Sequence, residues 1–149
     1  MRRCEGFTLV ETMVVMVIMA VLGALAYPSY AGYMVRTHRV EAQVALLETM
    51  QDQERYYSLH NAYLPFSADS SGEDEKRFRW WLGSTPQRSA YELSAQPCDN
   101  QPLQSCIQVR AVPGTSRVDA RFRDPDCETL TLTSTGEHGA GGRTKGCWP

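Results

Sequence analysis

The sequence predicts an α+β protein in which one long N-terminal α-helix packs against a four-stranded antiparallel β-sheet. An apolar run near the N-terminus continues into a helical pattern. The C-terminal half alternates apolar and polar residues with a period of two, which is typical of half-buried strands. We expect the apolar half of the helix to protrude and the amphipathic half to pack. With the apolar run set aside, the 149 residues suffice for one globular head.

The first predicted element is a helix over residues 7–29, in which Glu11 is the only charged residue. At about 1.5 Å per residue, a helix of this length matches the ~30 Å hydrocarbon core of a membrane. Arg2 and Arg3 precede it, which favours a cytoplasmic N-terminus and a head on the far side of the membrane. Because a carboxylate inside an apolar span is costly, Glu11 needs a partner.

The same N-terminal residues also fit an ordinary secretory signal. Such a signal has a basic start, an apolar stretch and a cleavage site of small residues, for which Ala24-Leu25-Ala26 qualifies. Two features favour a retained anchor instead: an ordinary signal has no use for Glu11, and the helical pattern continues past Tyr27. The residues alone leave both alternatives open.

A longer motif covers the start of the apolar run. Residues 6–11 read GFTLVE, and the run ends in YPSY at residues 27–30. This pattern resembles the prepilin signature of type IV pilins and of the related pseudopilins. The resemblance implies that a prepilin peptidase cuts after Gly6 and methylates the new N-terminus at Phe7. The apolar helix would then stay on as the core of a filament.

The resemblance also implies a partner for Glu11 in subunit assembly. After cleavage, its carboxylate would pair with the N-terminal amine of a neighbouring subunit, and such a pair is strong in a dry filament core. An acid that merely favours the start of a helix is the alternative role. The implied divisions are a leader peptide at 1–6, a transmembrane and filament-core helix at 7–29, and a pilin head at 30–149.

The function implied is that of a structural subunit of a type IV pilus, closest to the minor pilins. The precursor would sit in the inner membrane by a single span, with a periplasmic head. It would then join a surface filament that supports adhesion, twitching motility or DNA uptake. The implied partners are other pilins, major and minor, the prepilin peptidase and the inner-membrane assembly platform. A pseudopilin of a type II secretion system and a DNA-uptake receptor pilin are the alternatives.

An amphipathic helical half is predicted from Tyr30 to Tyr57. Pro28 lacks a backbone N–H and is expected to kink or loosen the helix before it resumes. One side of the helical wheel carries the apolar residues Val40, Val44, Leu47, Met50 and Tyr57. We expect this stripe to pack on the head; a cofactor-binding stripe is the rarer alternative, and no cofactor is implied.

Four strands with one apolar face are predicted in the C-terminal part of the chain. They are YELSAQP at 91–97, CIQVRAV at 106–112, VDARFR at 118–123 and TLTLTS at 129–134. Short connections rich in Pro, Gly, Asn and Asp join them, so an antiparallel meander is the simplest topology. Residues 59–89 before them read as an irregular loop with one short turn of helix. Within that loop, Trp80 and Trp81 fit either a partner surface or the edge of the core.

The five cysteines suit an oxidising compartment once the leader is removed. Cys4 lies in the leader, and removing it leaves an even number in the C-terminal half. Zinc is the alternative, but no C-x-x-C pair is present. The closing Gly-rich loop and Cys-Trp resemble the disulfide-bounded C-terminal loop of type IV pilins. We therefore pair Cys127 with Cys147, and Cys98 with Cys106 across a hairpin; neither pairing follows from spacing alone.

No active site is predicted, so the chain is expected not to be an enzyme. His38, His60 and His138 have no nucleophile and orienting acid at a recognisable spacing. Residues 144–146 read TKG, the reverse of the order that a phosphate-binding loop needs.

Three arginines are the candidate contact with DNA. Arg110, Arg121 and Arg123 are expected on the outer face of the sheet, where they would meet DNA phosphates. A solvated sheet face is the alternative. The net charge of -2 does not indicate nucleic-acid binding by itself.

Overall fold

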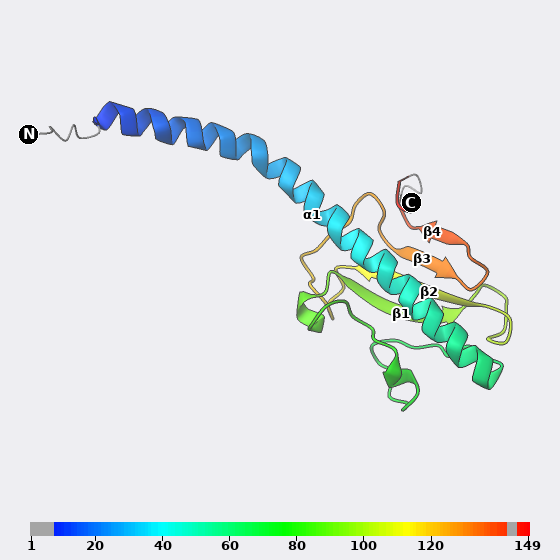
Figure 1. Ribbon diagram of the computed structural model, residues 1–149. Helices are drawn as coiled ribbons and strands as arrows, with labels where there is room; N and C mark the ends of the chain where they lie inside the picture. The colour runs from blue at the N-terminus through cyan, green and yellow to red at the C-terminus, as the bar shows by residue number, and fades with distance from the viewer. Residues whose placement is uncertain (1–7, 143–145) are drawn as a thin grey trace, which may run out of the picture. The chain divides into compact units, whose positions relative to one another are not determined.

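The computed structural model describes residues 8–142 and 146–149 (Figure 1). Its elements are helix α1 (Leu9–His60), the short 3-10 helices η1 (Glu75–Arg77) and η2 (Pro86–Arg88), and strands β1 (Tyr91–Pro97), β2 (Ile107–Pro113), β3 (Leu130–Thr133) and β4 (His138–Ala140). The chain forms two compact units, one ending at Arg36 and one from Thr37 to Pro149. We call the second unit the head.

Helix α1 has a defined start and end. The Thr8 hydroxyl accepts a hydrogen bond from the Glu11 N–H at 3.3 Å and so caps the first turn. The helix ends at His60, and Asn61 follows with a positive φ of 54°, a conformation that asparagine tolerates. The helical assignment is unbroken at position 28, where a kink or loosening is expected from the proline.

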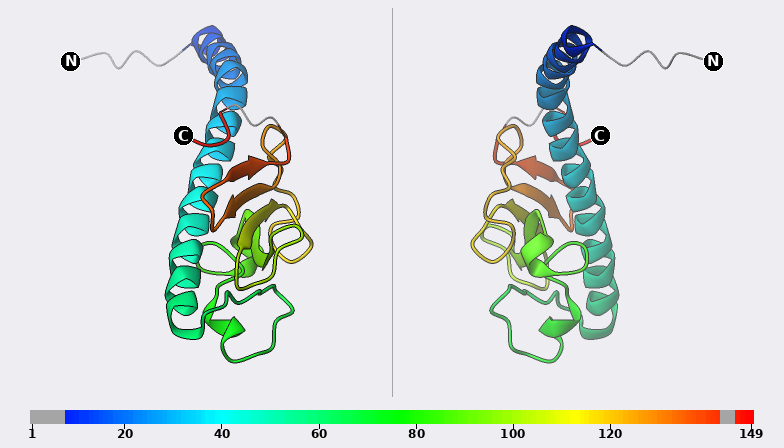
Figure 2. Two further views of the ribbon diagram at one scale, coloured as in Figure 1. Left: turned by 90° about the vertical axis from the view of Figure 1, so that its right-hand side faces the viewer. Right: turned by 90° about the vertical axis from the view of Figure 1, so that its left-hand side faces the viewer.

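The four strands form one antiparallel sheet in the order β1-β2-β3-β4. The register pairs Leu93 with Ala111 and Val109 with Leu132, so apolar residues of neighbouring strands share one face. Within the head, α1 lies along this face (Figure 2). The α+β class and the antiparallel meander are therefore confirmed.

The strand predicted at 118–123 is wrong. These residues form turns, because the Asp119 side chain accepts the Arg121 N–H at 3.0 Å and its carbonyl accepts the Phe122 N–H at 3.0 Å. Val118 is buried, and the Phe122 ring packs 5.3 Å from that of Tyr91. The apolar alternation that resembled a strand thus reflects two side chains that turn inward from a loop.

The fourth strand of the sheet is β4, in a stretch expected to be a glycine-rich loop. β4 pairs with β3 through Leu132 and His138 and through Thr131 and Gly139. A side chain at Gly139 would collide with that of Thr131. Glycine therefore occurs here because the Thr131 side chain of β3 approaches closely, and not because the segment is irregular.

The buried face of α1 is not the predicted stripe. Within the head, the buried residues of the helix are Arg39, Ala42, Leu46, Met50 and Gln53. Met50 was predicted and Tyr57 is partly buried against the core, but Val40, Val44 and Leu47 are exposed. The face differs because its two polar members find partners: Gln53, for example, bonds both the N–H and the carbonyl of Leu64.

The loop between α1 and β1 is irregular, as predicted, with two short turns of 3-10 helix instead of one. It covers the free edge of β1 through the bridges Phe66 to Ala95 and Trp81 to Glu92. Such cover protects an edge strand from pairing with other chains. Trp80 packs against the core, whereas Trp81 lines a groove between α1 and this loop.

Candidate assembly helix and disulfide-bounded C-terminal region

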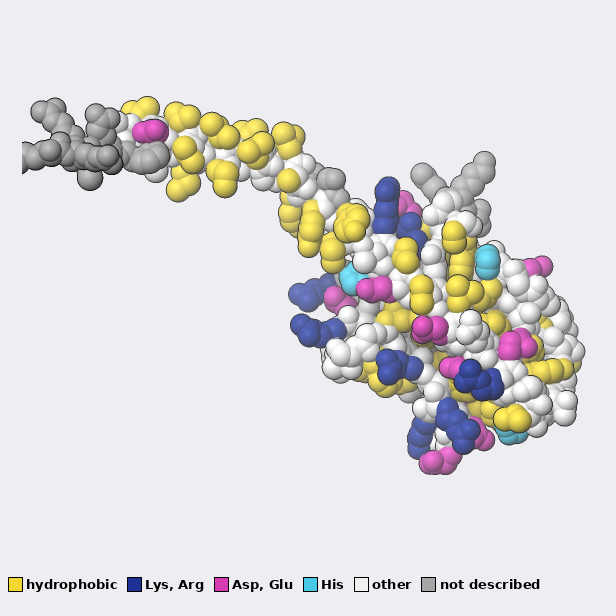
Figure 3. Space-filling model, in the orientation of Figure 1, with side chains coloured by type: hydrophobic (Ala, Val, Ile, Leu, Met, Phe, Trp, Pro, Cys, Tyr) yellow, Lys and Arg dark blue, Asp and Glu magenta, His cyan; other side chains and the backbone are white. Residues whose placement is uncertain are grey.

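The N-terminal part of α1 carries a continuous apolar surface (Figure 3). Its large apolar side chains between Leu9 and Leu25 are 49–77% exposed. The helix is long and apolar enough to cross a membrane, and none of its most apolar stretch is buried within the described chain. This surface therefore needs a membrane or other chains to cover it.

Glu11 is the acidic residue of this surface. Its backbone N–H is bound by the Thr8 hydroxyl, and the spacing T-x-x-E is that of a capping box. Among residues 8–142 and 146–149, its carboxylate has no ion-pair partner. Gly6 and Phe7 lie outside the described residues. Leader cleavage, N-methylation and the pairing of Glu11 thus stay predictions.

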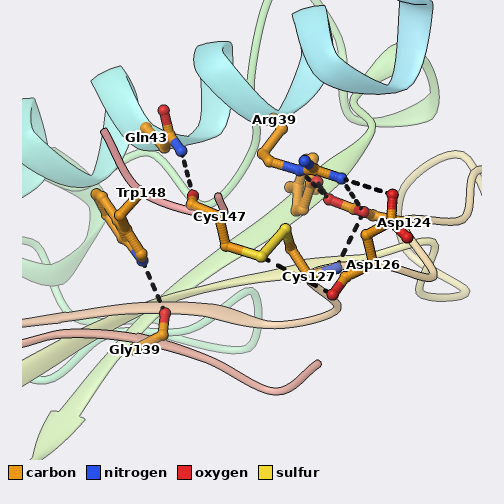
Figure 4. Close-up of a disulfide and its surroundings, with 9 residues drawn as sticks. Arg39, Gln43, Asp124, Asp126, Cys127, Gly139, Cys147 and Trp148 are labelled. Carbon is orange, nitrogen blue, oxygen red and sulfur yellow. Dashed lines mark hydrogen bonds and ion pairs between the residues drawn. A yellow bond between two sulfur atoms is a disulfide. The ribbon is translucent and has the colours of Figure 1, made fainter. Parts of the chain in front are cut away.

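Two disulfides tie the C-terminal half together, with the pairing that the resemblance implied. Cys98 bonds Cys106 across the connection between β1 and β2, and Cys127 bonds Cys147 near the C-terminus. Cys106, Cys127 and Cys147 are buried. The second disulfide (Figure 4) joins residues 20 positions apart in the sequence, and β3 and β4 lie between them.

A buried ionic network joins α1 to this region (Figure 4). Asp124 accepts hydrogen bonds from Arg39 Nε at 2.8 Å and Nη2 at 2.6 Å, from the Tyr91 hydroxyl at 2.7 Å and from the Cys127 N–H at 3.2 Å. The Asp124 side chain is 0% exposed and that of Arg39 10%. We call these three side chains, Arg39, Tyr91 and Asp124, the Arg39 network.

The Arg39 network shifts the titration of its members. Burial raises the pKa of Asp124, but the hydrogen bonds from Arg39, Tyr91 and Cys127 outweigh it and hold that pKa below its usual range. Burial, together with the bond to Asp124, raises the pKa of Tyr91. Sequence patterns did not reveal this network, because Arg39 and Asp124 are 85 residues apart.

The last residues of the chain are held to both α1 and the sheet. The Gln43 side chain donates a hydrogen bond to the Cys147 carbonyl at 2.5 Å, and the Trp148 indole N–H donates to the Gly139 carbonyl at 2.9 Å. The Trp148 ring stacks on His138 with centroids 4.4 Å apart. The C-terminal region is therefore an integral part of the head.

The three arginines predicted to contact DNA do not share one element. Arg110 lies on β2, half-buried, and donates to the Gln96 side chain at 3.2 Å. Arg121 and Arg123 lie in the turns before β3, where the Arg121 side chain is 94% exposed. Arg123 donates to the carbonyls of Ala120 and Phe122, both at 2.7 Å. Of the three, Arg121 is the most available to a ligand.

The histidines make structural contacts. His38 bonds Glu41 at 2.9 Å, and His60 stacks on Tyr56 with ring centroids 3.9 Å apart. Within the part of the chain that the structure describes, no cluster of His, Cys, Asp or Glu side chains is arranged to hold a metal ion.

Comparison with known families gives two matches. Residues 1–27 match the prokaryotic N-terminal methylation motif. Residues 28–131 match the family described as type IV minor pilin ComP, DNA uptake sequence receptor. Curated protein sequences give no significant match.

Solved structures similar to the chain include two type IV pilins. A type IV pilin from Shewanella oneidensis is 27% identical, with a TM-score of 0.49, and the match covers 77% of this chain and 98% of that one. The non-core minor pilin PilV of Neisseria meningitidis is 18% identical, with a TM-score of 0.50, and the match covers 77% of this chain and 94% of that one. The PilV match supports the pilin fold. Because the ComP family match covers most of the chain, and the methylation motif precedes it, the chain belongs to the type IV minor pilin family.

Proposed function

We propose that this minor pilin is cleaved between Gly6 and Phe7, methylated at Phe7, and assembled with other pilins into a surface pilus through α1. Before assembly, the precursor is held in the inner membrane by residues 7–29, with residues 30–149 in the periplasm. The assembly platform and the prepilin peptidase of that membrane are its partners. The observation that carries this proposal is the exposed apolar surface of α1 with Glu11 at its start.

The apolar surface supports transfer from a membrane into a filament. Burial of apolar area is favourable by about 25 cal/mol per Å² relative to water, so this helix is stable in lipid or among other apolar helices. Lipid and neighbouring helices are similarly apolar, and therefore burial by itself does not favour leaving the membrane. A polar interaction that forms only between subunits supplies that preference, and Glu11 is the residue available for it.

Glu11 has two separable roles in this proposal. Its position completes a capping box with Thr8, and its charge pairs with the N-terminal amine of Phe7 on a neighbouring subunit. Glutamine supports a capping box as well as glutamate does but carries no charge. The variants Glu11→Gln and Glu11→Val therefore distinguish the two roles.

Both variants are expected to insert into the membrane and lose the leader normally. Removing one member of a dry ion pair costs about 3–5 kcal/mol, so at least a tenfold loss from sheared filaments is expected for both variants. The measurement is the ratio of this protein in filaments to its processed inner-membrane pool. If Glu11→Gln assembles like the wild type while Glu11→Val does not, Glu11 acts as a helix cap and the ion pair is refuted.

A second function, contact with DNA, is favoured by the description of the matched family. The candidate residues are Arg110, Arg121 and Arg123, of which Arg121 is the most exposed. Each phosphate contact steepens the fall of affinity with salt by about 0.9 in log–log slope. The head should therefore bind duplex DNA more weakly at 200 mM than at 50 mM salt.

Replacing all three arginines by alanine should flatten that salt dependence, whereas Arg88→Ala serves as a control at an exposed arginine elsewhere. Equal affinity and slope in the triple variant and the wild type would exclude these arginines as the DNA contact.

A further inference from the structure

The head contains a groove between α1 and the loop before β1. Its volume is about 750 Å³, which is in the range of sites that bind small ligands. All of its lining residues lie between Val40 and Leu93, so the groove belongs to the head alone. None of the three arginines proposed to contact DNA lines it. The groove is therefore a separate feature of the molecule.

Part of the groove's lining is apolar. Val44 of α1, which is 49% exposed, contributes to it, as do Leu82 of the loop and the buried Leu93 of β1. Trp81 lines the loop side, and its indole nitrogen is buried without a hydrogen-bond partner among the described residues. The ring therefore presents carbon atoms to the groove and not its N–H. Such an aromatic surface packs well against the apolar face of a ligand.

The charged residues of the groove differ in the hydrogen bonds that they can make. Helix α1 contributes the carboxylates of Glu41, Glu48 and Asp52, which only accept hydrogen bonds when ionised. The loop contributes the guanidinium groups of Arg77 and Arg79, which only donate them. A complementary ligand therefore donates on the helix side and accepts on the loop side.

One charged group on each side of the groove is available to a ligand. Glu48 is exposed and has no ion pair within residues 8–142 and 146–149. Arg79 is exposed as well, and its Nη1 donates to the Gly83 carbonyl at 3.3 Å. Its guanidinium carbon lies 5.6 Å from the centre of the Trp81 ring. Arg79 is thus held beside the aromatic surface of the groove.

The arrangement of charges disfavours a ligand of one sign. A polyanion such as DNA would meet the three carboxylates, and a polycation would meet the two arginines; like charges brought together destabilise a complex. The carboxylates follow one another along the helix from residue 41 to residue 52, which is about 16 Å at 1.5 Å per residue. The groove is therefore longer than a single sugar ring.

We propose that this groove binds a neutral oligosaccharide. Each sugar hydroxyl both donates and accepts hydrogen bonds, so one ligand satisfies the carboxylates and the arginines. The carbon–hydrogen faces of its rings pack on Trp81 and Leu82. An extended peptide would gain most from a free strand edge, but the edge of β1 is already bridged by Phe66 and Trp81. The oligosaccharide fits what the groove offers without that edge.

Saturation-transfer NMR on the purified full-length chain tests this proposal. The protein is kept in micelles of lauryldimethylamine oxide, a detergent that contains no sugar. The probes are cellotriose, maltotriose and triacetylchitotriose, of which at least one should receive saturation at its ring protons and bind more tightly than its monosaccharide. Because a neutral ligand releases no counterions, its dissociation constant should change by less than about twofold between about 50 and 200 mM salt.

Variants locate the bound sugar. Glu48→Ala and Arg79→Ala each remove a charged hydrogen-bonding group, so each should weaken binding about tenfold. Glu48→Gln keeps an acceptor and should weaken binding by about threefold or less. Both positions are exposed, so the fold should tolerate these changes. Glu137→Ala, at an exposed acid between β3 and β4, is the control and should bind like the wild type.

Several results would overturn the proposal. One is that none of the trisaccharides receives saturation; another is wild-type affinity in both Glu48→Ala and Arg79→Ala, which would place the sugar elsewhere. Affinity that falls severalfold with salt would show that charge pairing holds the ligand. If a peptide of alternating lysine, leucine and glutamate binds and no sugar does, the groove is a peptide site. These assays use purified protein, so their outcome is independent of whether the chain assembles into pili.

Discussion

The buried carboxylate of Asp124 offers the sharpest test of how the head is held together. Replacing Asp124 by asparagine keeps the shape of the side chain and removes its charge. In the structure, this side chain is fully buried and bonds both Arg39 and Tyr91. The Arg39 guanidinium would keep its charge and retain only Asp126, 3.7 Å away and 71% exposed, as an ionic partner.

The expected loss follows from this burial. Removing one partner of a buried ion pair costs about 3–5 kcal/mol, because the other charge stays desolvated. For a head of this size, 1 kcal/mol shifts the melting temperature by about 4 °C, so Asp124→Asn should lower it by about 12–20 °C. An exposed ion pair provides a comparison: Arg117 donates two hydrogen bonds to the Asp69 carboxylate in a bidentate geometry, at 2.7 and 2.6 Å. Asp69→Asn should change the melting temperature little, since solvent screens that pair.

Thermal unfolding followed by circular dichroism, on a chain expressed from Tyr30 to Pro149, measures both variants at pH 7. If Asp124→Asn melts within about 3 °C of the wild type, the Arg39 network does not stabilise the head and the reasoning from burial is wrong. If Asp69→Asn is equally destabilising, the bidentate geometry of an ion pair contributes more to the stability of the head than its burial does.

Two further predictions concern the same region. The folded-state pKa of Asp124 lies below its unfolded value of about 3.9, so its contribution to the free energy of unfolding is complete above that pH and is lost as the pH falls through the folded pKa. Melting temperatures measured from pH 7 to pH 2 should therefore fall more steeply below pH 4 for the wild type than for Asp124→Asn. Parallel curves for the two proteins would contradict this. Replacing both Cys127 and Cys147 by serine removes a disulfide that joins residues 20 positions apart and stabilises the fold by about 3 kcal/mol in the entropic treatment. The double variant should therefore unfold at a lower urea concentration than the wild type. An unchanged urea midpoint would show that packing alone holds the C-terminal region.

The sequence predicted those parts of the molecule that depend on local pattern. The motif at residues 6–11 and the alternation in β1, β2 and β3 each lie within a few consecutive residues. The strand at 118–123 was wrong because the Asp119 turn bonds outweigh an alternation of only three apolar residues. β4 was missed because its short sequence, HGA, lacks strand-forming residues. It is a strand because it pairs with β3, which the local sequence does not indicate.

The face of α1 was misjudged for a long-range reason. The hydrophobic pattern predicts Val40 and Val44 as core residues. In the structure, Ala42 and Leu46 are buried instead, on the same face as the buried Arg39. That choice depends on Asp124, whose approach to Arg39 follows from the tertiary fold.

Mass spectrometry of this protein recovered from sheared pili tests the central claim most directly. The account predicts that the protein is present in the filaments, begins at Phe7 and carries a methyl group on that N-terminal amine. A mature chain that begins at Tyr27, or a protein confined to the membrane fraction of piliated cells, would contradict assembly through α1.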